Sequence, residues 1–79
     1  MRLQEITTEI LRQLAAWDSP ADEAVLHQQL NNRFSPEVTY VELGESLTLL
    51  HRNRFINRFD NIKGPRWSIT DKGRAELHA

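Results

Sequence analysis

The side chains best suited to chemistry form a basic strip in the C-terminal half of the chain. Residues 52–66 hold five basic groups and one acidic group, a net charge of +4, although the full chain of 79 residues sums to −1. Such side chains donate hydrogen bonds to phosphate oxygens, so the strip could bind an anion. The residues concerned are Arg52, Arg54, Arg58, Asn61, Lys63 and Arg66. The same charges would serve equally in a solvated hairpin that arginines keep soluble.

Patterns for catalysis, metal binding and cofactor binding are missing from the sequence. The chain has no cysteine, and His27, His51 and His78 lack the spacing of metal ligands on one helix face. No serine has the flanking glycines of a nucleophile elbow, and no glycine-rich loop could cradle a phosphate. We therefore expect a protein that is not an enzyme and that holds no metal ion or cofactor.

Length and composition favour one small globular domain that spans residues 1–79. Hydrophobic residues make up 39% of the chain and charged residues 27%, which are ordinary values for a globular protein. Nothing resembles a signal peptide or the run of about 20 apolar residues that spans a membrane. We expect a cytoplasmic protein without membrane contact.

An amphipathic helix over residues 36–52 leads into the basic strip. Leu43, Leu47 and Leu50 recur at the spacing that lines one face of a helix. Ser35 is a good N-cap, and Pro36 suits the first helical position because its missing N–H costs nothing there. The pattern predicts that the helix begins at residue 36.

The outward face of this helix follows from turning the three leucines toward the core. Thr39 and Tyr40 are then expected on the core side, and Leu49 under the hairpin that follows. Gly44 costs about 1 kcal/mol relative to alanine in a helix, so it either admits a neighbouring helix or is a tolerated weak point. The exposed face holds Val38, Val41, Glu45 and Thr48, with Arg52 at its end.

Two further helices are predicted before this one. Apolar residues that step by three or four positions predict a first helix of about four turns; they are Leu3, Ile6, Ile10, Leu14 and Trp17. Ser19 and Pro20 repeat the cap-and-proline start signal, with Asp22 in the first turn of a second helix that runs to Asn31.

A hairpin and a short helix are predicted after it. Residues 55–59 and 67–69 have the character of two strands, and the loop between them is rich in turn-forming residues. Thr70 can cap a final helix that runs to residue 78. The order predicts an α+β fold, mainly α, with three helices, a two-stranded hairpin and a short C-terminal helix.

Two motifs resemble those of winged helix-turn-helix regulators. Leu47 and Leu50 followed by residues 54–56, RFI, resemble the run L-x-x-L-x-x-x-G-[LYF]-I. Residues 67–77, WSITDKGRAEL, resemble the segment Y-x-L-T-x-K-G-x-x-x-L that follows the wing in MarR- and PadR-like proteins. The resemblance covers about residues 19–77.

This resemblance implies a transcriptional regulator that binds double-stranded DNA. The helix 36–52 would be the recognition helix and enter the major groove, and residues 55–69 would form the wing on the backbone or in the minor groove. The wing and its base would bind DNA through the six residues of the basic strip. The valines of the recognition helix could contact thymine methyl groups.

The sequence departs from the family in two places and leaves one alternative open. Arg54 stands where the motif has glycine, so Asn53 is expected to make the turn instead. The chain also lacks the long helices through which MarR- and PadR-like proteins usually dimerise, so a homodimer stays undecided. The alternative function is a protein-interaction module, because Val38 and Val41 lie among acidic residues on the outward helix face.

Overall fold

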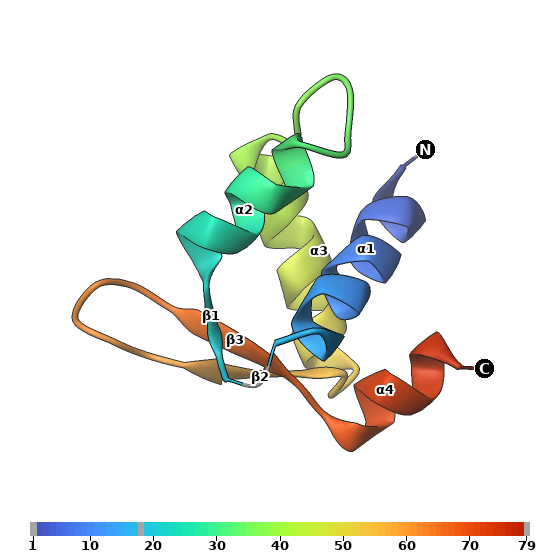
Figure 1. Cartoon of the computed structure of the whole chain (residues 1–79), viewed down its shortest axis with the longest axis vertical. Helices are drawn as coiled ribbons and strands as arrows, with labels where there is room; N and C mark the ends of the chain where they lie inside the picture. The colour runs from blue at the N-terminus through green and yellow to red at the C-terminus, as the bar shows by residue number, and fades with distance from the viewer. Residues whose placement is uncertain (1, 18, 79) are drawn as a thin grey trace.

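The computed structural model describes residues 2–17 and 19–78 and has the expected α+β architecture (Figure 1). The helices are α1 (Leu3–Ala15), α2 (Glu23–Asn31), α3 (Tyr40–Arg52) and α4 (Asp71–Leu77). The strands are β1 (Ala21–Asp22), β2 (Ile56–Phe59) and β3 (Arg66–Ile69). Helices α1, α2 and α3 pack together, and the sheet and α4 lie across one end of them.

The core is built from the apolar faces that the sequence indicates. Ile6, Ile10 and Leu14 of α1 are buried, as are Leu43, Leu47 and Leu50 of α3. The first helix is shorter than predicted, because it ends at Ala15 and Trp17 lies beyond it with 38% of its surface exposed. Leu11, which the predicted stripe omitted, is buried instead.

The start of α3 corrects the prediction by four residues. The N-cap is Thr39, whose side chain accepts from the backbone N–H of Glu42 at 3.1 Å, while the Glu42 carboxylate accepts from the N–H of Thr39 at 3.0 Å. This reciprocal capping box satisfies two donors at once, which a serine before Pro36 does not do. Residues 35–38 form a loop, and Tyr40 is 80% exposed rather than turned toward the core.

Val38 is buried in that loop, which contradicts its predicted place on the outward helix face. Only 2% of its surface is exposed. Its N–H donates to the Asn31 side-chain oxygen at 2.7 Å, and its carbonyl oxygen lies 2.6 Å from Nε2 of His27. Two side chains of α2 therefore hold the backbone of Val38 and direct its side chain into the core.

The sheet has three antiparallel strands in the order β1-β3-β2, where two were predicted. Ala21 pairs with Trp67, and Asp22 with Arg66. The indole N–H of Trp67 donates to Glu23 at 3.0 Å. These residues of the second predicted helix are extended because β3, distant in sequence, gives them partners, so α2 begins only at Glu23.

The turn from α3 into β2 is made by Arg54 itself, not by Asn53. Arg54 has a φ of 63°, the left-handed region that glycine adopts most easily, whereas Asn53 has an ordinary φ of −86°. The N–H of Phe55 donates to the Leu50 carbonyl at 3.0 Å across this turn. Arg54 therefore has a conformation that favours glycine, at the position where the motif that the sequence resembles has glycine.

Helix α4 begins as predicted. The Thr70 side chain accepts from the N–H of Gly73 at 3.0 Å. A Cβ atom on Gly73 would collide with the carbonyl oxygen of Phe55. This glycine is the one in the K-G motif, and it lets α4 lie directly against the start of the wing.

Candidate nucleic-acid interface

The outward face of α3 contains three of the four residues that the sequence placed there. Val41, Glu45 and Thr48 are exposed, and 69% of the Val41 surface is open to solvent. They line a shallow groove together with Leu3, Tyr40, Gly44, Leu49 and Arg52. Val38 lies in the core, but Leu3, Tyr40 and Leu49 line the groove beside Val41, so this face remains largely apolar.

Two residues of this groove differ from their predicted roles. Leu49 does not lie under the wing but lines the groove beside Leu3 of α1. A Cβ atom on Gly44 would meet no other atom within 4 Å, so this glycine does not serve the packing of the described helices. It leaves the middle of the exposed face flat.

Strand alternation divides the wing arginines between two faces of the sheet. Arg58 is opposite Trp67, and its guanidinium lies 5.7 Å from the centre of that buried ring on the face toward the helices. Arg66 is opposite Phe59, so it points to the other face. The structure therefore does not bring these two arginines together.

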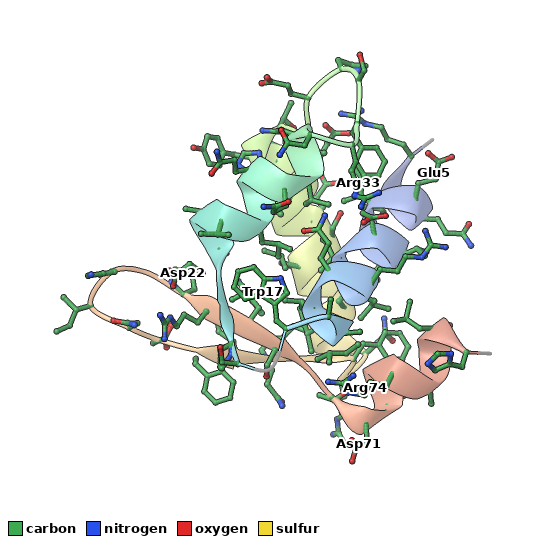
Figure 2. The ribbon with its side chains drawn as sticks, in the orientation of Figure 1. Glu5, Trp17, Asp22, Arg33, Asp71 and Arg74 are labelled. Carbon is green, nitrogen blue, oxygen red and sulfur yellow. The ribbon has the colours of Figure 1, made fainter. Side chains whose placement is uncertain are left out.

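Both wing arginines also have carboxylate partners. Arg66 donates to Asp22 of β1 at 2.8 Å, and Arg58 donates to Asp60 at 3.1 Å. Figure 2 shows Asp22 beside the sheet. Asp60 is already counted in the net charge of +4 for residues 52–66, so Asp22 is the partner that offsets this charge further.

Three other cations of the basic strip are not offset by a carboxylate of the described residues. Among residues 2–17 and 19–78, no carboxylate forms an ion pair with Arg52, Arg54 or Lys63. Lys63 lines a groove between the wing and the start of α2, and Tyr40 and Leu43 of α3 line the same groove. Arg54 lies at the other end of the wing, at the turn into β2.

The wing tip is a hydrogen-bonded turn. The Asn61 side-chain oxygen accepts from the N–H of Lys63 at 3.3 Å, and the Asn61 carbonyl accepts from the N–H of Gly64 at 3.0 Å. Gly64 has a φ of 122°, which favours glycine at this position. Asn61 thus shapes the turn that holds Lys63.

Arg2 stabilises the entry to α3, which the sequence gave no sign of. Its guanidinium donates twice to the Glu42 carboxylate, at 2.8 Å each, and also to the carbonyl oxygens of Pro36 and Glu37. The hydrogen bonds from Arg2 lower the pKa of Glu42 to about 2, with help from the N–H of Thr39. The capping box could have been found from Thr39 and Glu42, but not this clasp to the N-terminus.

The described helices include none that is long and apolar enough to cross a membrane. Across residues 2–17 and 19–78, His, Cys, Asp and Glu side chains do not gather in groups of three or more that could hold a metal ion.

Comparison with known proteins identifies the fold. No protein-family model matches the chain, and no curated protein matches it. Among solved structures, F93 from STIV, described as a winged-helix DNA-binding protein, matches with a TM-score of 0.78 and 20% identity over 99% of this chain and 83% of that one. TA0346 from Thermoplasma acidophilum, provisionally described as a transcriptional regulator, matches with a TM-score of 0.76 and 21% identity over 96% of this chain and 74% of that one. The chain therefore has the winged-helix fold.

Proposed function

We propose that this winged-helix chain binds double-stranded DNA and acts as a transcriptional regulator. Helix α3 would enter the major groove, and the wing would lie on the backbone or in the minor groove. The observation that carries the proposal is the open outward face of α3, together with Lys63 of the wing, which lines a groove that also includes Tyr40 of α3. The descriptions of F93 and TA0346 support the same role.

The cations are not expected to contribute equally. We assign the main phosphate contacts to Lys63 and Arg52, because neither forms an ion pair within the described residues. Arg58 and Arg66 should contribute less, since Asp60 and Asp22 already compete for their charge. Arg54 and Asn61 lie at the base and the tip of the wing and would complete the contact.

The α3 face would read bases through small side chains. The methyl groups of Val41 and Thr48 suit contact with the thymine methyl group, and the Glu45 carboxylate can accept from the cytosine amino group. Arg52 at the end of this face can donate to guanine or to a phosphate.

Affinity should depend only moderately on salt. The chain has a net charge of −1, and few of its cations are available on this side, so about two or three phosphate contacts are expected. The logarithm of the association constant should then fall with the logarithm of salt concentration with a slope of about −2 to −3.

The test is a fluorescence-anisotropy titration of duplex DNA at low and high salt. Lys63→Ala and Arg52→Ala should each weaken binding to all duplexes alike and reduce the salt slope by about 1. The matched control is Arg33→Ala, since Figure 2 shows Arg33 beside α1, on the side of the molecule away from the wing loop. Absence of binding at low salt would refute the proposal. So would binding that a variant with both Lys63→Ala and Arg52→Ala does not alter.

Several finer assignments belong to the same proposal. They are a relationship to MarR- and PadR-like regulators, a cytoplasmic location, a binding role without catalysis, and one domain over residues 1–79. Light scattering beside the titration would show whether the chain binds as a monomer, as a homodimer or with a protein partner. The protein-interaction alternative rested on Val38 and Val41 together, and it is not pursued because Val38 is buried and of the two valines only Val41 is exposed.

A further inference from the structure

Ile62 at the tip of the wing is the most exposed large apolar side chain among the described residues. Its relative exposure is that of an isoleucine in an extended peptide, so it touches nothing else in the fold. The wing loop extends away from the helices, as the left side of Figure 1 shows. Packing and stability therefore give no reason for an isoleucine at this position.

The turn around Ile62 fixes where it points. The N–H groups of Lys63 and Gly64 are both bonded to Asn61, which closes the loop directly around the isoleucine. Gly64 takes a backbone conformation that other residues avoid. The side chain is thus presented on an ordered turn, with a lysine next to it.

A lone apolar side chain among charged neighbours limits the kinds of partner. A standard protein interface buries about 800 Å² on each side around an apolar centre, which Ile62 cannot provide with Asp60, Asn61 and Lys63 as its neighbours. One isoleucine is, however, enough to act as a wedge between two base pairs from the minor groove. The adjacent Lys63 would hold a phosphate of the same groove.

We propose that Ile62 inserts into the minor groove as an apolar wedge and bends the duplex. This inference rests on the proposed DNA binding and adds to it. Insertion separates two stacked base pairs, which is easiest at flexible pyrimidine–purine steps such as TA. The wing would thereby select sequences by how readily they deform, at positions that α3 does not read.

The test is energy transfer between dyes at the two ends of a duplex of about 30 base pairs, with either a TA step or a GC step under the wing. Binding of the unaltered chain should bring the ends closer, and more so on the TA duplex. Ile62→Ala should lose this change and weaken binding to the TA duplex about tenfold, because apolar contact is lost. Its salt slope should stay the same, since no charge is removed.

Two variants serve as controls. Ile62→Leu keeps the apolar bulk and should retain both the bend and the affinity. Lys63→Ala should weaken binding and reduce the salt slope by about 1 while the bend remains. Both side chains lie outside the core, so thermal melting should confirm that all three variants are folded.

The outcomes separate the wedge from DNA binding itself. If Ile62→Ala binds and bends the TA duplex as the unaltered chain does, the wedge is wrong and the proposed function stands. The same conclusion holds if Ile62→Ala instead loses co-sedimentation with phosphatidylserine vesicles and leaves DNA binding unchanged. If the unaltered chain binds no duplex at low salt, the proposed function fails and the wedge with it.

Discussion

At the scale of single residues, the difference between Val38 and Val41 changes what the α3 region can do. Both valines were predicted on one exposed face, but the capping box at Thr39 starts the helix after Val38. Val38 then contributes to the core, and Val41 to the outer groove. Only the second valine is available to a partner.

A pair of aspartate substitutions tests this assignment. Val38→Asp would bury an unpaired charge and should lower the free energy of unfolding by about 3–5 kcal/mol, a large part of the stability of a small domain. Val41→Asp should change it by less than about 0.5 kcal/mol, since the side chain is exposed. Urea denaturation followed by circular dichroism measures both.

The DNA affinity of the Val41→Asp variant should be measured alongside its stability. Val41→Asp should remain folded and bind DNA more weakly, because it adds negative charge at the proposed major-groove face. Equal stability of the two variants would contradict the burial of Val38.

At the scale of elements, the junction between α3 and β2 depends on the backbone conformation of one residue. Arg54 takes a left-handed φ of 63°. The neighbouring Asn53 has an ordinary φ, and its side chain donates to the Leu49 carbonyl at 2.9 Å. The strain therefore lies at the position where the family motif has glycine.

Glycine at this position should stabilise the chain. Arg54→Gly relieves the left-handed conformation of a residue with a Cβ atom and should raise the free energy of unfolding by about 0.5–1 kcal/mol. Asn53→Gly is the matched control, and it should destabilise, since it removes a hydrogen bond and relieves no strain. Thermal unfolding compares the two variants, and a gain for Asn53→Gly instead would place the turn where the sequence predicted it.

How far the sequence predicts the elements depends on whether the determinants are local. The buried face of α1 from Ile6 to Leu14, the Thr70 cap and the two strands of the wing follow from neighbouring residues, and the structure confirms them, whereas Trp17 lies beyond the helix. Strand β1 depends on pairing between Ala21 and Trp67, which no local pattern reveals. The basic strip stays a prediction as a binding site, and the partner that offsets Arg66 is Asp22, far away in the sequence. A count of charges along the chain cannot detect that pairing.

At the scale of the whole molecule, the clasp between Arg2 and Glu42 joins the start of the chain to the α2–α3 loop. Its four hydrogen bonds reach the Glu42 carboxylate and the carbonyl oxygens of Pro36 and Glu37. The loop that sets the start of α3 is thus held by a residue at the start of the chain.

This clasp predicts a specific dependence of stability on pH. The pKa of Glu42 is lowered from 4.5 to about 2, so its contribution is complete above pH 4.5 and is lost as the pH falls toward 2. Glu42→Gln should melt at a lower temperature than the unaltered chain at pH 7, and the two melting temperatures should converge near pH 2. Circular-dichroism melts across this range provide the measurement.

A double-mutant cycle separates the clasp from other titrating carboxylates. Once Arg2→Ala has removed the donor, Glu42→Gln should have a much smaller further effect at pH 7. Additive effects of the two substitutions would show that the clasp does not contribute in solution.

The pairing of β1 with β3 has a consequence for how the molecule could measure DNA shape. Because β1 runs directly into α2, and Glu23 at the start of α2 binds the indole of Trp67, the wing cannot swing independently of the helices. Under the proposed function, α3 and the wing keep a fixed angle to each other while α3 occupies a major groove and the wing the adjacent minor groove. Duplexes whose grooves already fit this angle would need the least further deformation on binding, and all others would have to be deformed more.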